Sequence, residues 1–153
     1  MANAVKPIPD GYHTVTPYLV ASNPGKLIDF LTSAFDAKVI ERLTGPDGNV
    51  AHAEMSLGDS RIMIGGARPG QPATQSTIYL YVPDTDALYK QAVGAGGVSI
   101  MAPVNQFYGD RNAGVKDAEG NQWYIATHVE DVAPDELQKR MEAAYGQQKK
   151  SAT

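Results

Sequence analysis

The side chains of this chain best suited to chemistry are an imidazole and a carboxylate that lie close together. His52 and Glu54 stand two positions apart in Val50–Leu57, where apolar and polar residues alternate as in a strand. Alternate residues of a strand point to the same face, so the two side chains would be neighbours. Such a pair can act as a general acid and base, or bind a divalent metal ion. An ordinary solvated sheet face would also carry such a pair, so both interpretations remain open.

A second group of polar side chains lies in the stretch Tyr108–Glu130. Asp110 and Arg111 stand where one strand is expected to begin, and His128 stands where the next one ends. An acid beside a guanidinium can bind a polar group of a ligand, but the two can equally form an ion pair that holds the loop. His128 can serve a site or cap the strand end.

Composition excludes several classes of protein. The 153 residues include no cysteine, which removes disulfides, thiolate ligands and cysteine nucleophiles and fits a cytoplasmic protein. The net charge is −4 without a cluster of basic residues, so we expect no nucleic-acid partner. No apolar run approaches the roughly 20 residues of a membrane span, and the N-terminus lacks the pattern of a secretory signal.

Strand and helix signals place these residues in two similar units. The first unit has four predicted strands and a helix that begins at Asn23-Pro24, where asparagine caps and proline takes the first helical position. Its strands are expected at His13–Ala21, Lys38–Leu43, Val50–Leu57 and Ser60–Ile64. The second unit is expected to place strands at Ser76–Val82, Val98–Met101, around Tyr108 and at Gln122–His128, with a helix from Asp84 to Gly96.

An internal repeat relates the two units. Tyr18-Leu19 and Tyr79-Leu80 precede their helices 61 positions apart (79 − 18). The same offset relates further apolar positions: Leu27 with Leu88, Leu31 with Ala92, Ala34 with Ala95, and Ala37 with Val98. The chain is therefore predicted to be an α+β protein of two tandem βαβββ modules, each with one helix on one face of a small sheet. The two open faces can then curl into a shared trough.

The predicted domain plan follows from this repeat. An extended arm covers residues 1–12, the first module 13–66, a linker 67–75 and the second module 76–130. A C-terminal helix with acidic residues in its first turn covers 131–146, where Gly146 is expected to end it. Residues 147–153 are expected to form a polar tail.

The repeat and the motifs of the last hairpin resemble one known superfamily. The run YGDR…V-x-D-x-x-G-N-x-W-x-I-A-T-H, with His-Ala-Glu on the third strand, is similar to the vicinal oxygen chelate proteins, which include glyoxalase I, extradiol dioxygenases and bleomycin-resistance proteins. More narrowly it resembles the PhnB-like and bleomycin-resistance-like branch. The resemblance implies a curved mixed-sheet trough (the glyoxalase/bleomycin resistance fold) and a homodimer that encloses a small-molecule ligand.

The same resemblance implies where a metal would lie. Metal enzymes of the superfamily carry one ligand on each of four strands, typically His, Glu, His and Glu. The corresponding positions here are Val15, Met63, Thr77 and Tyr124, none of which is a good metal ligand. We therefore expect neither the usual metal site nor another cofactor.

Strand alternation predicts the lining of the trough. Thr77, Tyr79 and Tyr81 share one face of their strand, and Tyr124 and His128 share one face of theirs. Trp123 should point the other way, toward the helix. The predicted ligand-binding residues are Tyr79, Tyr81, Tyr124, Thr77, Met63, Asp110, Arg111 and His128. Tyrosine suits a planar or amphipathic ligand, because it offers ring area and a hydrogen-bonding hydroxyl.

Three functions agree with these observations. The leading hypothesis is a metal-independent protein that binds a drug-like molecule or metabolite, as bleomycin-resistance proteins do in antibiotic resistance. The alternative is a lyase or isomerase that uses His52 and Glu54 as an acid–base pair or as a displaced metal site. The third is a partner-binding module, in which the C-terminal helix and the polar tail mediate assembly.

Overall fold

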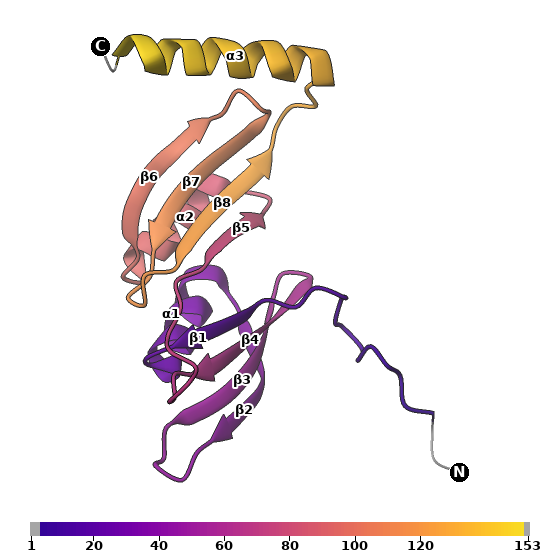
Figure 1. The fold of residues 1–153 in the computed structure, drawn as a ribbon, viewed down its shortest axis with the longest axis vertical. Coiled ribbons are helices and arrows are strands. Elements are labelled where there is room, and N and C mark those ends of the chain that lie inside the picture. Colours follow the sequence, from indigo (N-terminus) through magenta and orange to yellow (C-terminus); the bar gives the residue numbers. More distant parts are fainter. Residues whose placement is uncertain (1–3, 152–153) are drawn as a thin grey trace.

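The chain forms two βαβββ modules followed by a separate helix (Figure 1). The computed structural model describes residues 4–151, so the first three residues of the predicted arm and the last two of the predicted tail lie outside it. The first module comprises β1 (Tyr18–Ala21), α1 (Pro24–Phe35), β2 (Lys38–Thr44), β3 (Val50–Leu57) and β4 (Ser60–Gly66). The second comprises β5 (Thr77–Tyr81), α2 (Thr85–Gly94), β6 (Val98–Asn105), β7 (Asp110–Lys116) and β8 (Gln122–His128), and α3 (Pro134–Ser151) follows.

The two sheets have the same strand order. The first runs β1-β4-β3-β2 and the second β5-β8-β7-β6, with the first and last strands of each module parallel. Tyr18 lies opposite Met63 in one parallel pair, and Tyr79 lies opposite Tyr124 in the other. Both partners are displaced by 61 positions (79 − 18 and 124 − 63), so the predicted repeat and fold class are confirmed.

Capping residues define both ends of helix α1. The Asn23 side chain accepts a hydrogen bond from the Lys26 amide, and Pro24 occupies the first turn, as predicted. The helix ends at Phe35, and Asp36 caps it in a left-handed conformation with φ 56°. Its apolar face buries Leu27 and Leu31 against the first sheet.

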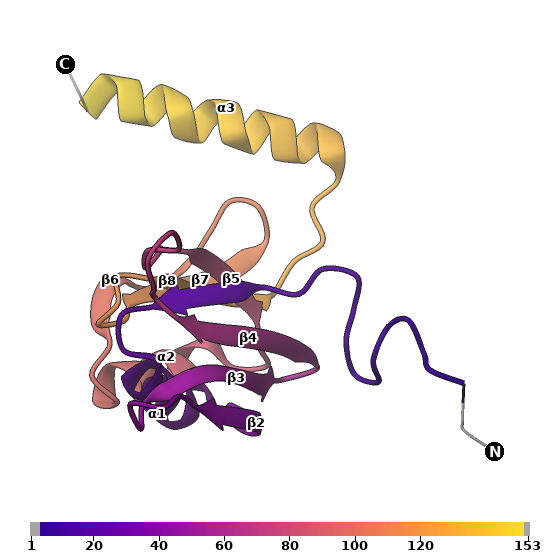
Figure 2. The same cartoon turned by 60° about the horizontal axis from the view of Figure 1, so that its bottom comes forward.

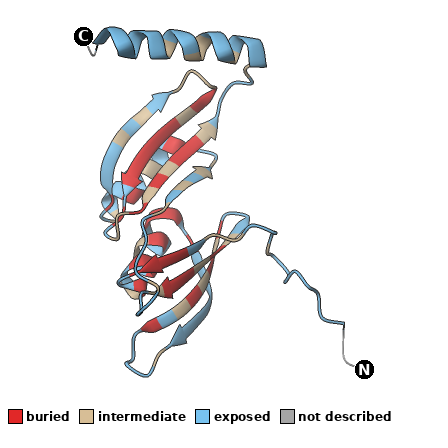
Figure 3. Cartoon of the chain, in the orientation of Figure 1, coloured by how far each residue is buried: buried red, intermediate tan, exposed pale blue. Residues whose placement is uncertain are grey.

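One apolar core spans both modules. Buried side chains of α1 and the first sheet join those of α2 and the second sheet in one cluster. Figure 3 shows buried residues on the helices and inner strands of both modules. Trp123 of β8 is fully buried beside Phe35, with ring centroids 5.3 Å apart, so its predicted orientation toward the helices is confirmed. The Glu119 carboxylate, from the turn before β8, accepts hydrogen bonds from the backbone amides of Ser22 and Asn23. The modules are thus held together by apolar packing and by this polar contact.

Three predicted boundaries differ from the observed ones by four or five residues (18 − 13, 105 − 101 and 151 − 146). The first strand begins at Tyr18 and not at His13, because Pro17 has no amide hydrogen and only its carbonyl pairs, with the Met63 amide. Strand β6 continues through Pro103 to Asn105, with register shifts that absorb the proline in an edge strand. Helix α3 does not end at Gly146.

Helix α3 continues to Ser151, so most of the predicted tail is helical. A glycine inside a helix destabilises it by about 1 kcal/mol relative to alanine. The helix continues past Gly146 because the glutamines and lysines that follow are good helix formers. Figure 2 shows the helix set apart from both sheets and joined to β8 by an extended connection, and none of its described residues is buried. No helix of the described residues is long and apolar enough to cross a membrane.

Candidate functional site

The open faces of the two sheets carry two separate polar clusters. The first-sheet cluster consists of Tyr12, Tyr18, Glu41, His52 and Glu54. The second-sheet cluster consists of Tyr79, Tyr81, Tyr108, Asp110, Asn112 and His128. No hydrogen bond or ion pair within residues 4–151 joins the two clusters.

Glu54 is the centre of the first-sheet cluster. The pairing of β2 with β3 places Glu41 directly opposite Glu54. Tyr12, from the N-terminal arm, donates its hydroxyl to Glu54, and His52 Nε2 lies 3.7 Å from Glu54 Oε2. His52 Nδ1 in turn lies 3.4 Å from the Tyr18 hydroxyl. The predicted neighbourhood of His52 and Glu54 is therefore observed, and Tyr12 and Glu41 join it from segments that sequence reasoning did not connect.

The two opposed carboxyl groups titrate differently. A hydrogen bond with Glu54 and the charge of that carboxylate raise the pKa of Glu41. Hydrogen bonds from Tyr12 and Glu41 lower the pKa of Glu54. Burial, with the hydrogen bond to Glu54, raises the pKa of Tyr12 to about 12. The pKa values of the two carboxyl groups are therefore shifted in opposite directions.

A buried aspartate organises the second-sheet cluster. Asp110 is 4% exposed. Its Oδ2 accepts hydrogen bonds from the hydroxyls of Tyr79 and Tyr81, at 2.7 and 2.9 Å respectively. His128 Nδ1 lies 2.9 Å from Asp110 Oδ1, and its Nε2 lies 2.7 Å from Asp131. A buried carboxylate needs such partners, since its desolvation is costly. The structure thus brings together four of the predicted residues: Tyr79, Tyr81, Asp110 and His128.

Asn112 is a member of this cluster that sequence reasoning missed. It is 2% exposed, and its Nδ2 donates to the hydroxyls of Tyr79 and Tyr108 at 3.1 and 2.7 Å. Its Oδ1 accepts from Gln106 Nε2 at 3.0 Å. Asn112 stands two positions after Asp110 on β7, so strand alternation from Asp110 was the signal that could have found it.

The tyrosine rings form a partly exposed aromatic surface. The rings of Tyr79 and Tyr81 meet edge to face with centroids 5.3 Å apart, and Tyr79 stacks near Tyr124 at 6.4 Å. Tyr79 is 40% exposed and Tyr81 is 66% exposed. Helix α2 covers the opposite face of this sheet, so the rings lie on the open face (Figure 1).

A glycine in the turn before β7 lets the backbone bend between two residues of this cluster, Tyr108 and Asp110. Gly109, between Tyr108 and Asp110, has φ 96°, a conformation that L-residues with side chains rarely adopt. A Cβ atom there would lie 2.2 Å from the Glu130 carbonyl oxygen. The Gly109 carbonyl also accepts the Val129 and Glu130 amides, so the turn before β7 is held against the chain after β8.

Hydrogen bonds decide the charge states within the cluster. Burial alone would raise the pKa of Asp110, but the hydrogen bonds from His128, Tyr79 and Tyr81 outweigh it and lower the pKa. Hydrogen bonds to Asp110 and Asp131 raise the pKa of His128. The hydrogen bond to Asp110 raises the pKa of Tyr81, and burial is the main cause of a raised pKa at Tyr79. The cluster therefore holds an ionised aspartate and neutral phenols.

Arg111 does not join the cluster, contrary to our prediction. Successive residues of β7 point to opposite faces, so Arg111 points toward α2 while Asp110 points to the open face. Its guanidinium pairs with Asp86 at 2.7 and 2.8 Å and contacts Asn105. The alternative considered for this pair, an ion pair between Asp110 and Arg111, is also wrong, because Arg111 pairs with Asp86.

The remaining predicted ligand-binding residues lie apart from Asp110. Met63 belongs to the first sheet, where it lies opposite Tyr18 and Glu54. Thr77 stands at the start of the edge strand β5, exposed and opposite Gln122. The Tyr124 hydroxyl donates to Gln122, and its ring extends the aromatic surface.

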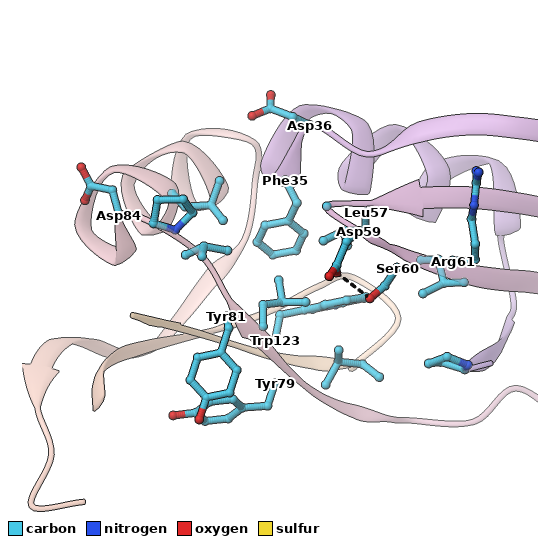
Figure 4. A pocket seen from close by; sticks show the side chains of 18 of the residues that line it. Phe35, Asp36, Leu57, Asp59, Ser60, Arg61, Tyr79, Tyr81, Asp84 and Trp123 are labelled. Carbon is cyan, nitrogen blue, oxygen red and sulfur yellow. Dashed lines mark hydrogen bonds between the residues drawn. The ribbon is translucent and has the colours of Figure 1, made fainter. Parts of the chain in front are cut away.

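A groove of about 960 Å³ lies between the modules (Figure 4). Tyr79 and Tyr81 project from one side of β5, while Phe35 and Leu57 lie on its other side. The groove follows the apolar junction of the modules and includes none of the buried polar groups around Asp110. The tyrosines thus connect an apolar groove to the polar cluster of the open face.

Comparison with known proteins identifies the family. The sequence profile of the Glyoxalase/Bleomycin resistance protein/Dioxygenase superfamily matches residues 12–125. The chain belongs to this superfamily. An uncharacterized protein of Mycobacterium bovis is 33% identical over an alignment of 138 residues, covering 83% of this chain and 91% of the relative. An uncharacterized protein of Mycobacterium tuberculosis is also 33% identical, covering 83% of this chain and 81% of the relative.

Solved structures share the superfamily fold. TioX from Micromonospora sp. ML1 has a TM-score of 0.66 at 22% identity, covering 75% of this chain and 98% of its own. A glyoxalase/bleomycin resistance protein/dioxygenase family enzyme from Burkholderia phytofirmans has a TM-score of 0.61 at 19% identity, covering 73% and 95% respectively. At these identities the likeness shows the fold of the superfamily alone.

The metal site implied by the superfamily does not fit these residues. Val15 lies before β1 and is 81% exposed, and the other aligned positions carry Met63, Thr77 and Tyr124. None supplies an imidazole or a carboxylate. Within residues 4–151 no group of three or more histidine or acidic side chains is arranged to hold a metal ion.

Proposed function

We propose that this superfamily member binds a small molecule, a drug-like compound or a metabolite, on the open face of the second sheet without using a metal. The observation that carries the proposal is the buried carboxylate of Asp110. It fixes the hydroxyls of Tyr79 and Tyr81 while leaving their rings exposed. Rings held in place before a ligand arrives lose less conformational entropy on binding, which favours affinity.

The charge states of the cluster support binding over proton transfer. General acid–base catalysis is most efficient when the group titrates near the working pH. The raised pKa values of Tyr79 and Tyr81 and the lowered pKa of Asp110 move these groups away from neutrality. Both ring nitrogens of His128 are already engaged by carboxylates. These groups are suited to orient a ligand.

The narrower assignment rests on sequence motifs. The YGDR run and the D-x-x-G-N turn resemble the PhnB-like and bleomycin-resistance-like branch, which supports a role in sequestering an antibiotic or related molecule in the cytoplasm. A thermal-shift screen of glycopeptides, aromatic antibiotics and metabolites tests it. We expect at least one class to raise the melting temperature of the native protein and not that of Tyr81→Ala. Absence of any shift across the screen would refute the proposal.

A specific observation favours a second function, a lyase or isomerase on the first sheet. Glu41 and Glu54 oppose each other with pKa values shifted apart, beside His52. Such a pair can supply an acid and a base. Elemental analysis of protein purified without chelator tests its metal-dependent form, which requires stoichiometric metal that is lost in His52→Ala. The metal-free form requires an activity that Glu54→Gln abolishes and Tyr81→Ala leaves intact.

We also infer that the protein is a homodimer, as its branch resemblance implies. The support is α3, whose half-buried residues Leu137, Met141 and Ala144 lie on one side of a helix without a buried residue. Sedimentation of the full chain and of a chain truncated after Glu130 tests this inference. A dimer that becomes a monomer on truncation is expected if α3 contributes the contact, and a monomeric full chain would contradict the inference.

A further inference from the structure

We infer that the second-sheet cluster selects planar organic cations that carry N–H donors, such as protonated aminoheteroaromatic compounds. This inference rests on the proposed small-molecule-binding function and adds the chemical class of the ligand. It follows from the direction of the hydrogen bonds, the exposure of the rings and the distribution of charge around them.

The hydrogen bonds of the cluster leave acceptors facing the ligand. An ionised aspartate only accepts, so the hydroxyl protons of Tyr79 and Tyr81 are both committed to Asp110. Tyr79 also accepts from Asn112. No side chain of residues 4–151 donates to the Tyr81 oxygen, so its lone pairs are available to a ligand. A phenol that donates to a carboxylate becomes a better acceptor, because hydrogen bonds in a chain polarise one another. A ligand that presents an N–H group therefore meets a matched partner.

The exposed rings favour positive charge. The face of a phenol ring carries the negative part of its quadrupole, so it attracts cations as well as apolar ring surface. Tyr79 and Tyr124 are nearly parallel, with 22° between their planes, and Tyr81 meets Tyr79 edge to face at 63°. This arrangement offers ring area for a planar ligand of several fused rings.

The formal charges near the cluster point the same way. Asp110 and Asp131 carry two negative charges on either side of His128, whose raised pKa supplies at most one positive charge. The Arg111 guanidinium on the same strand pairs with Asp86 on the other face of the sheet. Lys116 shares the face of Asp110 but lies six positions along β7, about 20 Å away. The ligand surface therefore has an excess of negative charge.

A matched set of three planar probes tests the inference in the full chain. Proflavine is a cation with N–H donors at pH 7.5, acridone is neutral, and acridine-9-carboxylate is an anion of the same ring system. Fluorescence titration measures the dissociation constant of each. We expect proflavine to bind at least about tenfold more tightly than the other two, the range that a desolvated cation–π contact provides.

Two variants locate the effect. Tyr81→Phe keeps the ring and removes the acceptor, and we expect it to weaken proflavine binding about three- to tenfold, the contribution of one hydrogen bond. Asp110→Asn removes the charge, and we expect the preference for the cation to fall below about threefold. Tyr89→Phe is the matched control, because Tyr89 on α2 donates to Ser99 away from the open face. It should leave all three constants unchanged.

The outcomes separate this inference from the proposed function. Equal binding of the three probes, or binding of none of them while the wider screen yields ligands, would overturn the cation inference and leave the binding function intact. A cation preference that Tyr81→Phe and Asp110→Asn leave unchanged would also overturn it, since the cation would then bind elsewhere. A screen without any ligand would remove the proposed function itself.

Discussion

Replacing Asp117 by asparagine changes one atom type in a buried turn and tests how the last hairpin is held. Asp117 is 5% exposed. Its Oδ1 accepts the Glu119 and Asn121 amides at 2.9 and 3.0 Å. Its Oδ2 accepts Asn121 Nδ2 at 3.0 Å and Trp123 Nε1 at 2.8 Å. Asparagine has nearly the same shape but only one acceptor oxygen.

The magnitude follows from counting donors. Whichever way the new amide is oriented, its NH₂ group faces two of the four N–H groups, which then lack an acceptor. A buried donor without a partner costs about 1–3 kcal/mol, so two cost about 2–6 kcal/mol. We expect a loss near 4 kcal/mol in the free energy of unfolding. For a domain of this size that lowers the melting temperature by about 8–16 °C.

Urea unfolding measures this loss. Trp123 is the single tryptophan of the chain, and circular dichroism provides a second probe because the substitution touches the indole. Asp47→Asn is the matched control, since Asp47 accepts from the amide and side chain of Asn49 in an exposed turn and should change little. A loss below about 1 kcal/mol for Asp117→Asn, at an unchanged m-value, would refute the reasoning.

Three other substitutions test the geometry around the second sheet. Gly109→Ala should lower the free energy of unfolding in urea by at least about 2 kcal/mol, because Gly109 has a positive φ and a Cβ atom there would collide with the Glu130 carbonyl. Gly48→Ala is the control: Gly48 also has a positive φ, but a Cβ atom there has open space, so the loss should be clearly smaller. The stability difference between the native protein and His128→Gln should be largest between about pH 4 and 6.5. The pKa of His128 is raised, so the stability that His128 contributes is full below about pH 6.5 and is lost as the pH rises further. The pKa of Asp110 is lowered, so the stability that Asp110 contributes is kept until the pH falls below about 4. A difference that grows above pH 7 would contradict this sign. Glu119→Ala should cost about 1–2 kcal/mol in thermal unfolding because two backbone amides at the start of α1 lose their acceptor, and an unchanged melting temperature would count against that contact.

Much of the fold was predictable because its signals are local or periodic. The 61-residue offset predicted the two modules, and the same register of Tyr18 with Met63 and of Tyr79 with Tyr124 confirms it. Alternation along β3 correctly placed His52 beside Glu54. It could not show that Tyr12 reaches Glu54, because the two are 42 positions apart and the arm has no periodicity.

The candidate site was predictable only in part. Sequence reasoning chose Tyr79, Tyr81, Asp110 and His128, which the structure brings together. It also chose Arg111, although alternation from Asp110 sends that side chain to the other face. Adjacent residues of a strand point to opposite faces, so Asp110 and Arg111 are neighbours in the sequence without sharing a site.

The sequence by itself determined the module plan, the N-terminal cap of α1 and the lack of suitable ligand residue types at the four positions aligned with the superfamily's metal site. These depend on residue type and spacing, which the chain carries wherever it folds. Only the tertiary structure decided that Asp110 is buried under two tyrosines and a histidine, that Arg111 turns to α2, and that Glu41 opposes Glu54. Those facts depend on which strands become neighbours and in which register, and a shift of one residue would reverse every face.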